Sequence, residues 1–191
     1  WEGLGYYNRV RNMQKAAQKI EEEYAGKFPE NYEEIKALPG IGNYTAGAIS
    51  SFAYGIPKPA VDGNVLRVVS RLLASDEDIM KASVRTKIEN AIEPVIPEDA
   101  ASDFNQGLIE LGAIVCVPNG EAKCEICPLT GICEAKRLGI QNELPVKKKA
   151  KARRIEERTV LIFKDGDHVA IRKRPDKGLL AGMYEFPNLD G

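Results

Sequence analysis

The sequence lacks the features of a membrane or secreted protein. No apolar run approaches the ~20 residues that cross a bilayer, and no charged and then apolar N-terminal segment resembles a secretory signal. Hydrophobic residues make up 43% and charged residues 29% of the 191 positions, a balance typical of a globular protein with a sizeable core. We therefore expect a cytoplasmic, monomeric protein of one domain or slightly more.

An excess of either charge is also missing. The chain has 27 basic and 28 acidic residues, so composition alone does not indicate nucleic-acid binding, and such a function has to rest on local charge. Basic residues cluster at Arg9, Arg11 and Lys15 and again over 147–154. Each cluster can be a solvated surface. For the second we favour a linker, because like charges in series repel one another and resist packing.

An initiator methionine and dispersed cysteines are absent as well. The chain begins with Trp1, a bulky aromatic residue, and we expect a fragment that is truncated at both ends. All four cysteines lie between Cys116 and Cys133. In a chain without a secretory signal, a cluster this tight indicates a metal site rather than a disulfide framework.

Most of the chain has the periodicity of helices. Apolar residues recur every three or four positions from Val10 to Tyr24, which predicts an amphipathic helix that ends before Gly26. Ser83 is a candidate N-cap for a later helix. The expected helices cover residues 5–24, 32–38, 43–49, a stretch that follows Asp62, 83–92 and 104–116.

The period changes after Arg158. Residues 159–163 are β-branched or aromatic, Asp165-Gly166 is a turn signal, and residues 168–171 form a second predicted strand. We expect a helical domain over 1–145, a basic linker over 146–157 and the start of a second domain over 158–191. The single histidine, His168, lies in a strand position and receives no role.

A glycine-rich turn, Leu38-Pro39-Gly40-Ile41-Gly42, separates two of the predicted helices. Residues without a Cβ let the backbone turn sharply and approach a ligand closely. The helix that follows offers unpaired N–H groups to a phosphate. One interpretation is an ordinary turn. The other is that Gly40, Ile41 and Gly42 hold a DNA backbone phosphate without reading sequence.

The order of these motifs resembles the helix–hairpin–helix DNA glycosylase superfamily, and in particular its adenine DNA glycosylase (MutY) family. Residues 38–49, Val61-Asp62-Gly63-Asn64-Val65 and the cysteine cluster carry the resemblance. It implies a mainly α fold and a base-excision repair enzyme of the bacterial nucleoid. It also implies a substrate, double-stranded DNA in which adenine is mispaired with 8-oxoguanine or guanine.

The resemblance places the catalytic carboxylate at Asp62. Breaking an N-glycosidic bond builds positive charge on the sugar, which a carboxylate stabilises. An Asp before a helix is also a common N-cap, and the two roles are compatible. Asn64 is expected to set the local geometry. The family's general-acid Glu comes from an earlier helix, and no residue here corresponds to it, so we expect the fragment itself to be inactive.

Tyr44 distinguishes two branches of the superfamily. Members similar to endonuclease III have a Lys at this position and form a Schiff base, which requires an amine. Tyr44 has none, which favours a monofunctional glycosylase, although the side chain can also serve packing alone. The alternatives are an endonuclease III-like glycosylase/AP lyase and a non-catalytic Fe–S module that binds DNA.

Tyr6 and Tyr7 form an aromatic pair beside the basic residue Arg9. The family uses this segment to probe the DNA stack, in keeping with the need to extrude a base before cleavage. The sequence does not indicate which tyrosine inserts, and either can instead belong to the core.

The cysteines Cys116, Cys124, Cys127 and Cys133 have the spacing C-x7-C-x2-C-x5-C. Four thiolates can bind zinc or an iron–sulfur cluster. Zinc sites usually pair two CxxC elements, whereas only one is present here. The resembled family carries a [4Fe-4S] cluster at this place, which we expect here too. In that family six residues separate the first two cysteines, whereas seven separate Cys116 from Cys124 here. A glycine-containing loop accommodates the extra residue.

The last segment resembles the beginning of the Nudix-like α/β domain that follows in the same family. Residues 171–175 and 178–187 carry the likeness. In the family that domain recognises the 8-oxoguanine opposite the target adenine.

Overall fold

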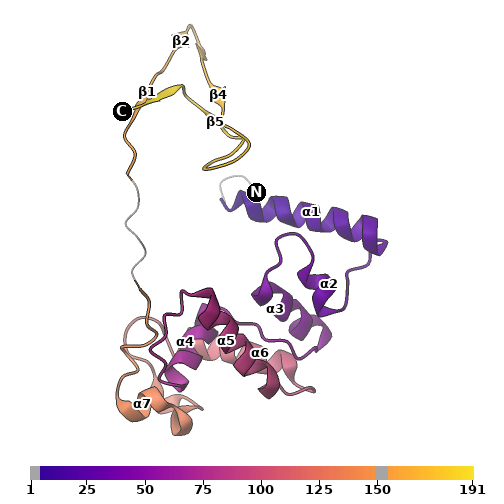
Figure 1. The fold of residues 1–191 in the computed structure, drawn as a ribbon, viewed down its shortest axis with the longest axis vertical. Coiled ribbons are helices and arrows are strands. Elements are labelled where there is room, and N and C mark those ends of the chain that lie inside the picture. The colour runs from indigo at the N-terminus through magenta and orange to yellow at the C-terminus, as the bar shows by residue number, and fades with distance from the viewer. Residues whose placement is uncertain (1–4, 149–154) are drawn as a thin grey trace. The chain divides into compact units, whose positions relative to one another are not determined.

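The computed structural model describes residues 5–148 and 155–191, which fall into two compact units divided after Lys148. The first unit is helical and the second consists of short strands (Figure 1). The described residues include only part of the proposed linker over 146–157. Trp1 and Glu2 lie outside them. Within the described residues, no helix combines the length and the apolar character that a membrane span requires.

Periodicity predicted the longer helices of the first unit. Its α-helices are α1 (Tyr7–Tyr24), α2 (Tyr32–Lys36), α3 (Asn43–Tyr54), α4 (Gly63–Leu72), α5 (Ala82–Ile92), α6 (Ala101–Glu110) and α7 (Glu134–Leu138). Shorter turns are η1 (Glu93–Val95), η3 (Cys124–Ile126) and η4 (Thr130–Ile132), and η2 (Leu111–Val115) is a π-helix. The last predicted helix, 104–116, is therefore an α-helix that widens into a π-turn directly before Cys116.

Three helix starts differ from the prediction, and one of them is that of α6, which begins at Ala101 rather than at Phe104. Helix α1 begins at Tyr7 rather than Gly5, because Gly5 and Tyr6 both adopt left-handed backbone angles, with φ +66° and +49°. Helix α5 begins at Ala82, and Lys81 occupies its N-cap without a side-chain hydrogen bond. Ser83 therefore lies inside the first turn, and its prediction as a cap is wrong.

The hydrophobic core of the first unit is built around α4, α5 and α6. Its buried members include Val65 and Val69 of α4 and Ile88 of α5, with Phe104 of α6 packed against them. Burying one such aliphatic side chain stabilises a fold by about 1.5–3 kcal/mol. Residues 65–71 of α4 are buried without interruption, and two of them are arginines.

Helix α1 contributes no buried residue. It contacts the end of α2 and the turn that follows. Lys19 Nζ donates to the Ala37 carbonyl at 3.4 Å, and Asn12 lies against Gly40. Its apolar stripe is only partly covered, and Met13 is 56% exposed.

The second unit consists of three antiparallel strand pairs. Its strands are β1 (Arg158–Val160), β2 (Lys164–Asp165), β3 (His168–Val169), β4 (Arg172–Lys173), β5 (Tyr184–Glu185) and β6 (Asn188–Asp190). The predicted turn at Asp165-Gly166 is present, since β2 pairs with β3. The predicted strand 159–163 is shorter, because β1 ends at Val160 and pairs with the distant β6.

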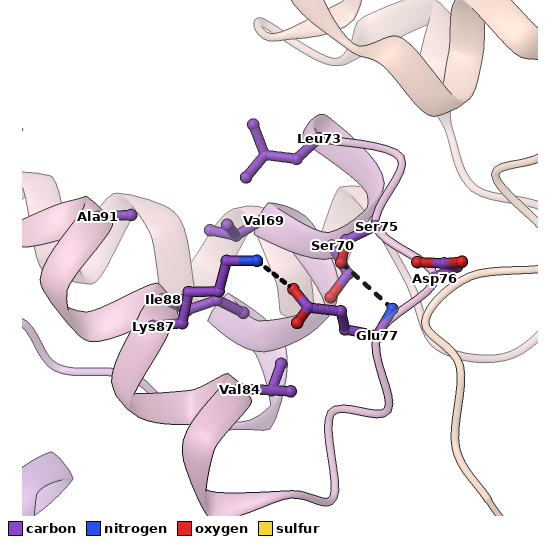
Figure 2. A pocket seen from close by; sticks show the side chains of 10 residues that line it. All are labelled: Val69, Ser70, Leu73, Ser75, Asp76, Glu77, Val84, Lys87, Ile88 and Ala91. Atoms are coloured by element: carbon purple, nitrogen blue, oxygen red, sulfur yellow. Dashed lines mark hydrogen bonds and ion pairs between the residues drawn. The ribbon is translucent and has the colours of Figure 1, made fainter.

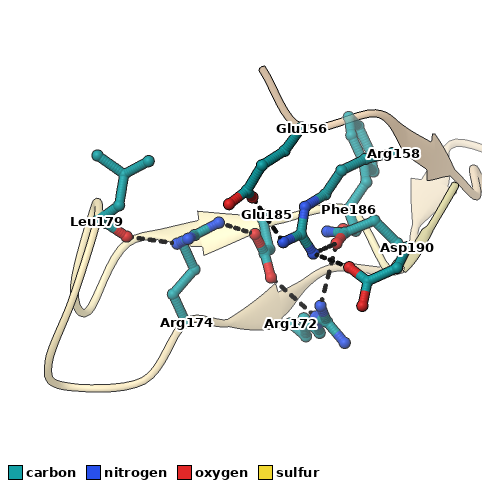
Figure 3. Close-up of polar contacts among 9 residues, drawn as sticks. Glu156, Arg158, Arg172, Arg174, Leu179, Glu185, Phe186 and Asp190 are labelled. Atoms are coloured by element: carbon teal, nitrogen blue, oxygen red, sulfur yellow. Dashed lines mark hydrogen bonds and ion pairs between the residues drawn. The ribbon is translucent and has the colours of Figure 1, made fainter. Parts of the chain in front are cut away.

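No described residue of the second unit is buried, so its strand pairs are accompanied by ion pairs near the surface rather than by a core. Glu185 lies between Arg172 and Arg174 and pairs with both (Figure 3). Partial burial opposes the charge of Glu185, but the hydrogen bond from Arg172 and the nearby guanidinium charges lower its pKa overall. Arg158 joins Glu156 and Asp190 at 2.9 and 3.0 Å.

Candidate nucleic-acid interface and catalytic carboxylate

The hairpin between α2 and α3 presents an open helix start. Gly40 has φ +81°, and a Cβ there would lie 2.6 Å from the Cβ of Asn12, so both backbone and space require glycine. Gly42 is exposed, occupies the N-cap of α3 and leaves the first turn without a side-chain cap. Among the described residues, no side chain caps the first N–H groups of α3, which leaves them available to an anion.

Asp62 occupies the N-cap of α4, so the predicted cap is confirmed. One carboxylate oxygen, Oδ1, accepts hydrogen bonds from the backbone N–H groups of Asn64 and Val65 at 2.8 and 2.9 Å. The other, Oδ2, accepts from the Asn64 side-chain amide at 2.9 Å. Three donors from two residues, Asn64 and Val65, thus hold the carboxylate in one orientation.

Arg67 stands directly behind Asn64. Its Nη2 donates to Asn64 Oδ1 at 2.9 Å and to the Gly112 carbonyl at 2.6 Å, and its Nε donates to the Cys116 carbonyl at 2.7 Å. Burial lowers the pKa of this guanidinium, and the neighbouring Cys116 opposes that shift. Arg67 therefore links the carboxylate of Asp62, through Asn64, to the first cysteine of the loop.

Arg71, one turn further along α4, contacts the cysteine loop itself. Its Nη1 donates to Cys116 Sγ at 3.2 Å and to the Val117 carbonyl at 3.0 Å, and its Nε donates to the Leu144 carbonyl at 2.9 Å. The sequence interpretation missed both arginines. The available signal was two charged residues four positions apart in a helix that is otherwise uncharged and mostly apolar.

The π-helix η2 brings the loop close to the N-terminus of α4. A Cβ added to Gly112 would lie 2.5 Å from the Cβ of Asn64, so the two backbones approach closely. Short π-turns inside helices frequently mark functional sites. Here the π-turn also exposes the Gly112 carbonyl to Arg67.

The four cysteines are unpaired and partly buried. Burial raises the pKa of the Cys124 thiol, Lys136 opposes this, and the charges of the other three cysteines raise it further. Cys124 is thus within electrostatic reach of the other three cysteines. Among the described residues, however, no three His, Cys, Asp or Glu side chains converge closely enough to hold a single metal ion.

The aromatic candidates differ in exposure. Tyr6 is 83% exposed and Tyr7 41%, and Tyr6 has the left-handed φ of +49° that side chains rarely adopt. Arg9 is exposed beside them, and Tyr44 is 40% exposed in the first turn of α3. No hydrogen bond between described residues joins these tyrosines to Asp62.

A pocket between α4 and α5 is separate from these residues. It has a volume of about 370 Å³, an apolar floor that includes Val69 and Ile88, and an ion pair between Lys87 and Glu77 at 2.6 Å (Figure 2). None of the predicted site residues lines it, so it is not the site of the predicted chemistry.

Comparison with known proteins gives a family match over the first half of the chain. Residues 1–94 match the model of the HhH-GPD superfamily base excision DNA repair protein. Adenine DNA glycosylases from Schizosaccharomyces pombe, Buchnera aphidicola and Homo sapiens are 33%, 34% and 32% identical and align with 99–100% of the chain. The chain covers 50%, 54% and 43% of these relatives, so it spans about half of their length.

Two solved structures have a fold similar to that of this chain. A thermostable thymine-DNA glycosylase matches with a TM-score of 0.59 and 28% identity, over 68% of this chain and 58% of its own. A trapped covalent complex of endonuclease III with DNA matches with a TM-score of 0.58 and 31% identity, over 70% of this chain and 60% of its own.

Proposed function

We propose that this chain, which belongs to the HhH-GPD superfamily of base excision DNA repair proteins, carries the sugar-facing half of an adenine DNA glycosylase site. The protein hydrolyses the N-glycosidic bond of adenine mispaired with 8-oxoguanine or guanine in duplex DNA, at the nucleoid. The observation that carries this proposal is Asp62, held by three hydrogen bonds at the N-terminus of α4.

The chemistry follows from the fixed carboxylate. As adenine departs, positive charge develops on the deoxyribose, and an oriented carboxylate beside the sugar stabilises that charge without reorganising. Water then adds to the sugar carbon. Asn64 orients the carboxylate through its amide, and Arg67 orients Asn64. The departing purine has to be protonated by an acid, a role that we assign to a group other than Asp62.

Tyr44 favours hydrolysis over strand cleavage. An AP lyase forms a Schiff base through an amine, and the phenol of Tyr44 cannot do so. The fold neighbours include endonuclease III, which makes a glycosylase/AP lyase the second candidate. The relatives that align with the whole chain are adenine DNA glycosylases, which favours the first.

DNA is held by two surfaces in this proposal. The open start of α3, at Gly40, Ile41 and Gly42, binds a backbone phosphate through its N–H groups. Tyr6, more exposed than Tyr7 and held with a left-handed φ, enters the base stack while the adenine is extruded. Arg9 contacts a phosphate beside it.

The cysteine loop fits a [4Fe-4S] cluster. Four thiolates in one loop are a full ligand set for such a cluster. Zinc sites usually pair two CxxC elements, and only one, Cys124 to Cys127, is present here, which favours a cluster over zinc. When bound, the cluster supplies structural order to the loop, and Arg71 donates to one of its ligands, Cys116.

The second unit is proposed to be part of a Nudix-like α/β domain that reads the base opposite the target adenine. Its short antiparallel strand pairs and the sequence likeness over 171–175 and 178–187 support this.

The experiment that tests the proposed function uses the full-length protein with duplexes that contain one lesion pair. We expect adenine release opposite 8-oxoguanine and no release of thymine glycol, measured by alkaline cleavage of end-labelled DNA under single-turnover conditions. Release of thymine glycol, with strand cleavage that needs no alkali, would support the lyase candidate. Binding to DNA without release of either base would support the non-catalytic candidate.

A further inference from the structure

The segment that delivers Asp62 has no regular structure of its own. Residues 58–61 lie between α3 and α4 outside any helix or strand, and Pro59, Ala60 and Val61 are buried. A buried segment outside helices and sheets needs other partners for its backbone N–H and carbonyl groups. Three helices provide contacts to it.

Asn105 of α6 pairs with this segment as a neighbouring strand would. It is 2% exposed, its Oδ1 accepts from the Ala60 N–H at 2.9 Å, and its Nδ2 donates to the Lys58 carbonyl at 3.1 Å. Nδ2 also donates to the Ala101 carbonyl of its own helix at 3.0 Å. A side-chain amide buried in a core is costly unless it is hydrogen-bonded, and these three bonds satisfy it.

Arg85 of α5 and Gly47 of α3 contact the same segment. Arg85 Nη1 donates to the Val61 carbonyl, directly before Asp62, at 2.6 Å. At Gly47 a Cβ would lie 2.0 Å from the Pro59 carbonyl oxygen, so α3 packs directly on the segment. The segment is thus held against α3, α5 and α6.

We propose that Asn105 and Arg85 are positioning residues for the glycosylase reaction, which set the place of Asp62 relative to the start of α3. Helix α3 presents the phosphate-holding hairpin at its first residue and packs on Pro59 about one turn later. The hairpin fixes the DNA, and the segment fixes the carboxylate. A small shift of the segment moves Asp62 away from the sugar and leaves the hairpin unchanged.

This inference rests on the proposed function, and its test separates binding from chemistry. In the full-length protein we compare Asn105→Ala with Gln106→Ala, an exposed neighbour on the same helix whose amide donates to the Ser102 hydroxyl. Misplacement by about 1 Å can cost ~10²-fold in rate. We expect Asn105→Ala to slow single-turnover release of adenine by roughly 10–10²-fold. Its Kd for uncleavable duplex and all properties of Gln106→Ala should stay close to wild type.

Arg85 gives a second pair of variants that does not open the core. Arg85→Ala should slow release at nearly unchanged DNA affinity. Arg85→Lys should restore much of the rate, because an ammonium on a long stem can still donate to the Val61 carbonyl. A purely structural role would not produce this rescue.

Hydrogen exchange of the peptide that contains residues 58–61 completes the test. The Ala60 amide should exchange faster in Asn105→Ala and at the wild-type rate in Gln106→Ala. Faster exchange with a normal release rate, or equal loss of rate and DNA affinity, would overturn the positioning role. If the wild-type protein releases no adenine although exchange responds as expected, the proposed function is wrong and the hydrogen-bonded contact stands.

Discussion

Arg71 donates a hydrogen bond to the sulfur of Cys116 across 3.2 Å. The arginine is 3% exposed and lies in α4, the helix that begins at Asp62. One guanidinium therefore connects the helix of the proposed catalytic carboxylate to a predicted cluster ligand, and Arg67 makes a second connection through the Cys116 carbonyl. Loss of order in the loop would consequently remove hydrogen bonds that hold these two side chains of α4.

The first prediction concerns the cysteine loop. Protein purified without oxygen should be brown and contain about four irons per chain, because four thiolates are the ligand set of one such cluster. Iron analysis and visible absorption measure this. Stoichiometric zinc with no broad visible absorption would contradict it.

A second prediction concerns Arg71→Leu. The change leaves the Leu144 and Val117 carbonyls without their donor, and each lost bond to a buried charged group costs about 1.5–3 kcal/mol. Denaturant unfolding should show this loss, together with lower iron content. The matched control is Arg137→Leu, which removes an exposed ion pair with Glu134 and should leave stability nearly unchanged, because exposed ion pairs contribute little. Equal stability of the two variants would argue against the link.

Third, Asp62→Asn in the full-length protein should abolish base release and largely retain DNA binding. The amide can still cap α4 through its oxygen, but it cannot balance the charge on the sugar, so several kcal/mol of transition-state stabilisation are lost. Single-turnover cleavage and a DNA-binding titration measure the two properties. Cleavage near the wild-type rate would rule out a catalytic role for Asp62.

A fourth prediction follows from Tyr44. Borohydride added during turnover should capture little or no covalent protein–DNA adduct, because no lysine stands at the position where a Schiff base forms. Denaturing gels of labelled DNA show the adduct directly. Efficient trapping would move the protein to the lyase branch.

The fifth prediction concerns residues 1–191 tested alone, which should not release adenine. Base departure requires a carboxylate for the sugar and an acid for the purine, and general acid catalysis contributes ~10²–10⁴-fold. Measurable glycosylase activity would refute this and point to an overlooked acid such as Glu2, which lies outside the described residues.

The sequence by itself determined the features whose physical basis is local. Apolar spacing predicted the long helices, since a face repeats every three or four residues. The cap at Asp62 was predictable because its oxygen meets N–H groups only two and three positions away. The turn at Asp165-Gly166 followed from the same short-range logic.

Only the tertiary structure decided which distant groups meet. Arg67 bonds to carbonyls 45 and 49 residues away, and Asn105 bonds to a segment 45 and 47 residues away. β1 pairs with β6 rather than with its neighbour in the chain. These partners depend on how whole helices and strands pack. The neighbouring residues in the sequence do not distinguish a buried arginine or asparagine from an exposed one, because its acceptors come from distant segments.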